Sequence, residues 1–119
     1  MTTVQNIKDL APEIVRQRLV IEGYPKREIT DNMISDYLSQ LCGVCDMVKL
    51  TEPVTHQSPK YGWAGWVHWE TSGAHFYAWD TPRLFFSVDI YTCKHFYVEK
   101  VVDFTINFFE SSETVFKEL

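Results

Sequence analysis

A cysteine pair and four histidines are the side chains in this sequence whose spacing invites a chemical interpretation. Cys42-Gly43-Val44-Cys45 has the spacing of a redox pair or of half a zinc site, yet no second pair and no closely spaced histidines accompany it. Both cysteines fall on an apolar stripe, so we predict buried structural thiols and no metal site. The scattered histidines are His56, His68, His75 and His95, for which ordinary sheet packing is the expectation.

Three tryptophans, Trp63, Trp66 and Trp69, fall within seven residues of one another. Such a cluster can pack a core, line an interface between subunits, or build walls for a flat or cationic ligand. We keep all three as candidate substrate-binding residues beside the packing interpretation. The sequence has no G-x-S-x-G, P-loop or G-x-G-x-x-G motif, so spacing alone indicates no hydrolase or nucleotide site.

The composition limits the classes of partner that the chain can have. With 119 residues, 45% of them apolar, the chain predicts a single globular domain over residues 1–119. Its net charge of −5 argues against nucleic acid, because phosphate binding needs clustered positive charge. No apolar run is long enough to span a membrane. Residues Met1 to Asn6 are polar and show no secretory signal, so we expect a cytoplasmic protein.

Hydrophobic periodicity divides the chain into strands and two helices. The helical stripes run from about Lys26 to Gly43 and from Tyr97 to Phe109. The fifth strand alternates, with Phe86, Val88 and Ile90 on one face and Ser87, Asp89 and Tyr91 on the other. The expected strands are Ile14–Ile21, Asp46–Glu52, Tyr61–Glu70, His75–Trp79, Leu84–Cys93 and Thr114–Phe116, with a break at Thr71-Ser72-Gly73.

This order of elements, β-α-β-β-β-β-α-β, predicts an α+β fold. Strands that arrive in runs favour an antiparallel sheet, with both helices packed on one face as a two-layer sandwich. The other sheet face is then solvated or an interface. Several aromatic side chains are expected there, so a homodimer is predicted.

Two stretches of the second half resemble the bacterial, pyruvoyl-dependent S-adenosylmethionine decarboxylase family. The first runs from Gly73 to Pro82, and the second is Phe86-Ser87-Val88-Asp89-Ile90-Tyr91-Thr92-Cys93. The most specific match is Val88 to Cys93, which is similar to the family's Val-Asp-Val-Phe-Thr-Cys strand. The order of elements fits from Ile14 to Leu119, and Glu22-Gly23 is similar to the Glu-Gly of eukaryotic relatives. The resemblance implies the same sandwich, with the sheets of two subunits meeting in a homodimer.

The resemblance also implies a chemistry. Members of the family cut themselves before a serine, which becomes a pyruvoyl group that serves as an electron sink for loss of CO₂ from S-adenosylmethionine. Here that serine is Ser72, with His75 beside the cleavage point. Cys93 stands at the position of the cysteine that reprotonates the product, and Glu22 is a carboxylate that could polarise the site. The activity serves polyamine (spermidine) biosynthesis in the family.

The chain departs from the family at the processing site. Counted from His75 and Pro82, the serine position falls on Ala74, and the assisting histidine becomes Trp79. Counted from Ala64-Gly65, it falls on Ser72, and Thr71-Ser72-Gly73-Ala74-His75 then replaces Glu-Ser-His. No pyruvoyl cofactor forms in the first register.

Three hypotheses follow from these departures. The first is a non-processing pseudoenzyme that binds a ligand such as S-adenosylmethionine, or a partner, and we rank it slightly first. The second is an active decarboxylase of S-adenosylmethionine or a related amino acid that cleaves itself at Ser72. The third is a regulatory subunit that pairs with a host decarboxylase.

Overall fold

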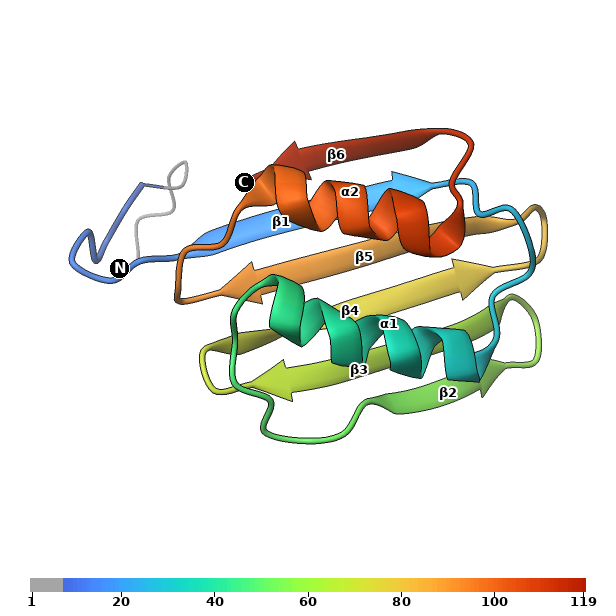
Figure 1. Ribbon diagram of the computed structural model, residues 1–119, viewed down its shortest axis with the longest axis horizontal. Coiled ribbons are helices and arrows are strands. Elements are labelled where there is room, and N and C mark those ends of the chain that lie inside the picture. Colours follow the sequence, from blue (N-terminus) through green and yellow to red (C-terminus); the bar gives the residue numbers. More distant parts are fainter. Residues whose placement is uncertain (1–7) are drawn as a thin grey trace, which may run out of the picture.

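The protein folds into one antiparallel sheet with two helices on the same face (Figure 1). A computed structural model describes residues 8–119. The sheet has six strands in the order β2-β3-β4-β5-β1-β6. The elements are β1 (Gln17–Gly23), α1 (Asp31–Val44), β2 (Val54–Ser58), β3 (Gly62–Trp69), β4 (Ser72–Trp79), β5 (Phe85–Thr92), α2 (Val98–Phe109) and β6 (Thr114–Glu118). The predicted α+β sandwich and its order of elements are therefore confirmed.

Helix α1 begins later than the sequence pattern suggested. The predicted start was near Lys26, but the helix begins at Asp31 because Thr30 is its N-cap. The Thr30 side chain accepts a hydrogen bond from the Met33 backbone N–H at 3.3 Å. That bond satisfies a donor which has no partner within the helix itself. Asp31 in the first turn adds a favourable charge at this end.

The second strand is the clearest error of the sequence prediction. Residues 46–52 form no strand apart from a single bridge between Lys49 and Trp69, and β2 instead follows Pro53. Proline is tolerated just before a strand, so Pro53 marks a start rather than an end. Likewise, β4 begins at Ser72 rather than His75, because the hairpin turn lies at Glu70–Thr71. Strand β1 runs later than predicted and reaches Gly23.

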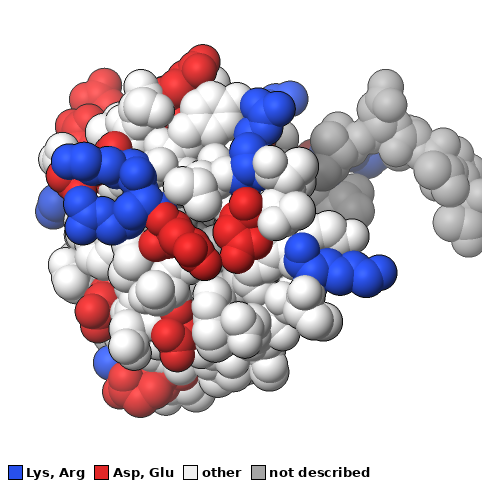
Figure 2. All heavy atoms as spheres, turned by 90° about the vertical axis from the view of Figure 1, so that its right-hand side faces the viewer, with Lys and Arg blue, Asp and Glu red and all other residues white. Residues whose placement is uncertain are grey.

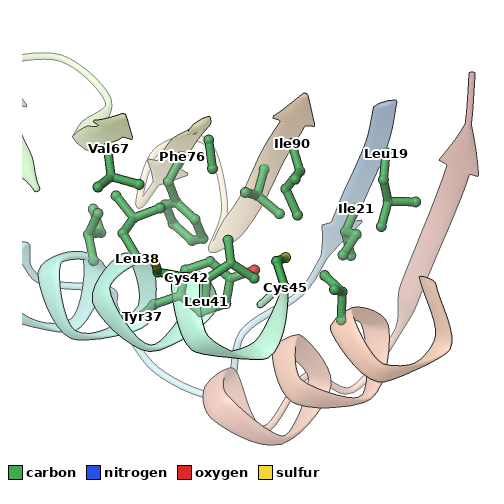
Figure 3. Close-up of a cluster of buried hydrophobic side chains, with 14 of the residues drawn as sticks. Leu19, Ile21, Tyr37, Leu38, Leu41, Cys42, Cys45, Val67, Phe76 and Ile90 are labelled. Carbon is green, nitrogen blue, oxygen red and sulfur yellow. The ribbon is translucent and has the colours of Figure 1, made fainter. Parts of the chain in front are cut away.

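The core lies between the helices and the sheet (Figure 3). Tyr37 of α1 is fully buried, and its hydroxyl lies 2.7 Å from the Thr105 hydroxyl of α2, which joins the two helices. Cys42 and Cys45 are buried free thiols, as predicted. Burial raises the pKa of Cys45 to about 12, so this thiol stays protonated and unreactive at neutral pH.

The sheet face away from the helices, which we name the open face, carries a different set of side chains. Trp66, His75, Tyr77, Asp89 and Tyr91 alternate along the strands with residues that point into the core. Tyr77 and Tyr91 are 43% and 44% exposed. The expectation of several aromatic residues on this face is therefore met.

The outer surface shows charges of both signs. On the end of the molecule seen in Figure 2, acidic and basic side chains lie side by side, and no extended basic surface covers that end. Lys26 and Arg27, for example, both pair with Glu110. No helix in residues 8–119 is long and apolar enough to cross a membrane. The prediction about Met1 to Asn6 lies outside the described residues.

Candidate active site

The hairpin between β3 and β4 places Ser72 at one end of the sheet, where β3 and β5 end and β4 begins (Figure 1). Ser72 pairs with Trp69 across the hairpin and with Thr92 on its other side. Cys93 follows Thr92 directly, so the register of two strand pairs brings Ser72 and Cys93 together. The sequence analysis named both residues as site candidates, and the structure places them next to each other.

One backbone donor serves both sides of the Thr71–Ser72 peptide bond. The N–H of Cys93 donates to the carbonyl oxygen of Thr71 and to Oγ of Ser72, each at 2.8 Å. An N–H aimed at a carbonyl oxygen stabilises the negative charge that this oxygen gains when a nucleophile attacks the carbon. The arrangement thus holds an electrophilic carbonyl, the adjacent hydroxyl and an oxyanion donor in one place.

The backbone at Ser72 is strained. Its φ is 146°, a conformation that residues with a side chain rarely adopt. Such a conformation costs on the order of 1–3 kcal/mol and persists only where the surrounding structure imposes it. Here the strand pairing on both sides of Ser72 imposes it.

Thr71 is held in place by the loop that follows α1. Its hydroxyl donates to Sδ of Met47 at 2.9 Å. Met47 is fixed in turn by Cys42, whose carbonyl accepts the Met47 N–H at 2.9 Å and whose thiol donates to the Met47 carbonyl at 3.1 Å. The cysteine that the sequence marked as structural therefore supports the residue next to Ser72.

A cavity of about 710 Å³ opens beside Ser72 on the open face. Across it, Arg18 of β1 makes a two-pronged ion pair with Asp89 of β5, with Nε–Oδ1 and Nη2–Oδ2 distances of 3.0 and 2.7 Å. This hydrogen bonding raises the pKa of Arg18. The lining residues are Arg18, Leu50, His68, Trp69, Glu70, Ser72, Gly73, His75, Asp89 and Tyr91. The volume suits a small organic ligand.

The other predicted site residues are only partly brought together. His75 lines the cavity with Ser72. Glu22 lies on the open face opposite Ser87, further along β1, and does not line the cavity. Cys93 is an exposed free cysteine at the end of β5.

The three tryptophans do not form one cluster. Trp63 and Trp69 face the helices, where Trp63 packs against the core and Trp69 is 2% exposed. Trp66 lies on the open face, where its ring centroid is 4.7 Å from that of His68. Side chains three residues apart alternate faces in a strand, so the spacing itself argued against a common site. Among the described residues, the Nε1 of Trp69 is the buried side-chain donor left without a hydrogen-bond partner.

The sequence analysis did not name several polar and aromatic residues of the cavity as site candidates: Arg18, His68, Glu70, Asp89 and Tyr91. The alternation of β5 did place Asp89 and Tyr91 on the face opposite the core. The hydrophobic pattern could not predict that β1 pairs with β5, and this pairing places Arg18 beside Asp89 and Tyr91. Arg18 is about 70 residues away from Asp89 in the sequence, so no local pattern indicates that the two side chains are in contact.

Comparisons with known proteins agree with this architecture. Residues 18–119 match the family described as S-adenosylmethionine decarboxylase. The crystal structure of the adenosylmethionine decarboxylase from Aquifex aeolicus VF5 superposes with a TM-score of 0.72 and 15% sequence identity, over 89% of each chain. A search of curated proteins gives no match. At that identity the structural likeness shows a common fold, and the family match covers most of the chain.

Proposed function

The chain belongs to the S-adenosylmethionine decarboxylase family, and we propose that it is a self-cleaving member that acts on S-adenosylmethionine or a related amino acid. Cleavage takes place between Thr71 and Ser72. The observation that carries the proposal is the Cys93 N–H, which is shared between the Thr71 carbonyl and the Ser72 hydroxyl. The bond to the Thr71 carbonyl continues the pairing of β4 with β5, whereas the bond to the Ser72 hydroxyl is additional to that pairing.

The atoms at the bond suit an intramolecular acyl shift. Oγ of Ser72 attacks the Thr71 carbonyl carbon, the Cys93 N–H stabilises the charge on the carbonyl oxygen, and the C–N bond breaks to leave an ester. Loss of the Ser72 α-proton then expels the Thr71 carboxylate. Hydrolysis of the remaining enamine releases ammonia and leaves a pyruvoyl cap on residues 72–119. Relief of the strained φ at Ser72 favours the first step.

The residues around Ser72 fit such a cap. It would stand beside the cavity, next to the strand end that carries Cys93. A bound pyruvoyl group supplies the electron sink for loss of CO₂. In this proposal Cys93 returns a proton to the product.

The cavity also suits a cationic substrate. Tyr91 and His68 present rings, which favour a sulfonium, and Glu70 adds a carboxylate, whereas the charge of Asp89 is already paired with Arg18. We further propose that two copies meet through the open face, which carries Tyr77 and Tyr91, and that the protein works in the cytoplasm in polyamine synthesis. Light scattering of the purified protein tests the dimer; a mass of one chain at micromolar concentration contradicts it.

A second candidate, the non-processing pseudoenzyme, is favoured by the neighbours of Ser72. Thr71 precedes it and Gly73 follows it, so neither the glutamate nor the histidine of the Glu-Ser-His motif is present. In this case the open face and its cavity would bind a ligand, or a decarboxylase subunit for which the protein is a regulatory partner.

Release of ¹⁴CO₂ separates these functions. We would incubate the purified protein with carboxyl-labelled S-adenosylmethionine and, separately, with other labelled amino acids. The proposed function predicts CO₂ release by the wild-type protein and none by Ser72→Ala. Equal release from both proteins would rule out a pyruvoyl mechanism. Binding without CO₂ release from any substrate would favour the pseudoenzyme.

A further inference from the structure

The row of β5 side chains that faces the helices ends in a hydroxyl. Phe86, Val88 and Ile90 fill this row with apolar groups, and Thr92 follows them with a fully buried side chain. Valine would have the same shape and no polar atom to satisfy, so packing alone does not require a hydroxyl here. The hydrogen bond that the hydroxyl makes indicates its purpose.

The Thr92 hydroxyl closes the bend that follows β5. Its Oγ1 donates to the carbonyl oxygen of Lys94, two residues further on, at 2.7 Å. The ring of atoms closed by this bond includes the peptide unit between Thr92 and Cys93, and therefore the Cys93 N–H. That N–H is the donor to the Thr71 carbonyl and to the Ser72 hydroxyl, each at 2.8 Å.

We propose that Thr92 is a positioning residue for self-cleavage, because its hydroxyl fixes the direction of the Cys93 N–H. The inference rests on the proposed self-cleavage and assigns one more residue to it. As Oγ of Ser72 bonds to the Thr71 carbonyl carbon, the carbonyl oxygen gains negative charge. The hydroxyl proton ends on the Ser72 nitrogen when the C–N bond breaks, so no further reactant is required. A donor that is already held in line stabilises the charge without reorganising.

The contact between Thr92 and the reacting residue is indirect. Ser72 and Thr92 are partners in the pairing of β4 with β5, and their side chains lie on the same face of the sheet. The Thr92 hydroxyl proton is nevertheless engaged by the Lys94 carbonyl. We therefore assign Thr92 no part in proton transfer, and its effect reaches the cleaved bond through the Cys93 backbone.

Two further anchors hold the loop between β5 and α2. Nζ of Lys94 donates to the Asp46 carbonyl oxygen at 2.6 Å. The Gln17 side chain accepts from the Phe96 N–H at 3.0 Å and donates to the Phe96 carbonyl at 3.1 Å. Both anchors lie beyond the bend, whereas the Thr92 bond spans the N–H itself. Loss of the Thr92 hydroxyl should therefore leave the loop in place and free the N–H to turn.

The test compares two buried threonines of residues 8–119, Thr92 and Thr105. Thr105 also donates its hydroxyl to a backbone carbonyl, that of Val101, at 2.8 Å. It lies within α2 and does not hold the loop that carries Cys93. Thr105→Val thus removes a buried hydrogen bond of the same kind and is the matched control.

Cleavage of freshly translated chains is timed on denaturing gels, with and without hydroxylamine. Hydroxylamine cleaves the ester as it forms, so in its presence the rate reports the acyl shift alone. We expect Thr92→Val to cleave roughly 10- to 100-fold more slowly under both conditions, because a misdirected donor loses much of its effect. Thr92→Ser keeps the hydroxyl and should stay close to the wild-type rate. Thr105→Val should cleave at the wild-type rate, although it is less stable.

The outcomes separate this inference from the proposed function. A wild type that cleaves under neither condition overturns both. A wild type that cleaves while Thr92→Val cleaves equally fast overturns the role of Thr92 alone. So does a Thr92→Val chain that hydroxylamine restores to the wild-type rate, because the hydroxyl would then act after the acyl shift.

A purely structural role for the hydroxyl predicts a different result. Equal slowing of Thr92→Val and Thr105→Val would assign the loss to stability and would contradict the proposal, as would a Thr92→Ser chain that is as slow as Thr92→Val. Thermal unfolding followed by circular dichroism shows whether the variants fold. If Thr92→Val does not fold, Thr92→Ala carries the comparison.

Discussion

Two hairpins of the same sheet hold nearly the same unusual backbone conformation with different residues. Gly62, after the β2–β3 turn, has a φ of 150°, and Ser72, after the β3–β4 turn, has a φ of 146°. Glycine adopts this conformation without steric cost, whereas serine does not. The difference shows that strain is avoided at one hairpin and retained at the other, where the hydroxyl is next to the bond that we propose is cleaved.

The serines of these two hairpins, Ser58 and Ser72, also differ in the backbone groups that donate hydrogen bonds to them. Ser58 accepts hydrogen bonds from Lys60 and Tyr61 of its own turn, at 3.2 and 3.3 Å. Ser72 accepts from Cys93, a residue 21 positions away that also donates to the Thr71 carbonyl. The first pattern closes a turn, and the second orients a peptide bond.

The largest expected effect distinguishes the two serines directly. Ser72→Ala should abolish cleavage, because it removes the hydroxyl that attacks the Thr71 carbonyl, while Ser58→Ala should cleave at the wild-type rate. Timed denaturing gels of newly translated chains measure both. Cleavage in Ser72→Ala would show that the bond breaks by another route.

The next effect concerns the glycine hairpin. In the uncleaved Ser72→Ala background, Gly62→Ala should lower the free energy of unfolding by about 3 kcal/mol, because the new Cβ overlaps the Ala78 carbonyl at a strained φ. Urea titration followed by circular dichroism measures the loss. A change below about 0.5 kcal/mol would mean that this hairpin is not under the steric constraint we assign to it.

Strain at residue 72 can be measured without cleavage, because neither Ser72→Ala nor Ser72→Gly has the hydroxyl. Ser72→Gly should be the more stable of the two by about 2 kcal/mol, since only glycine accepts this φ freely. The matched pair Ser87→Ala and Ser87→Gly in strand β5 should show the opposite order, by about 0.5–1 kcal/mol. If alanine is also the more stable residue at position 72, the strain is absent.

The smallest expected effect concerns the hydrogen bond from the Thr71 hydroxyl to Sδ of Met47, which holds Thr71 in place. Thr71→Val and Met47→Leu each remove the hydroxyl–sulfur contact at 2.9 Å and should slow cleavage about tenfold, equivalent to about 1.4 kcal/mol. Thr71→Ser keeps the hydroxyl and should stay close to the wild-type rate. The double variant should be no slower than either single one, and additive effects would show that the two residues act separately.

The sequence predicted the arrangement of elements better than the contents of the site. The helical stripe through Tyr37, Leu38 and Leu41 and the alternation of β5 determine which faces are buried, so local periodicity was sufficient for the sandwich. The interpretation of Pro53 failed because proline is compatible with either end of a strand. The cavity depends on pairings such as Arg18 with Tyr91, which join residues far apart in the chain.

Ser72 and Cys93 were predicted as site residues from motif similarity, whereas Arg18 and Asp89 were not. The position of Arg18 and Asp89 at the cavity depends on the register of β1 against β5. The spacing of residues along the sequence does not reveal this register. The three tryptophans were misjudged as one group because their spacing was read without the alternation of a strand.

The mass of the purified protein under denaturing conditions tests the central claim most directly. We expect two species, one of residues 1–71 with a free carboxyl end and one of residues 72–119 that resists Edman degradation until it is treated with a carbonyl reagent. A single intact species of 14.0 kDa, unchanged after prolonged incubation, would contradict the account.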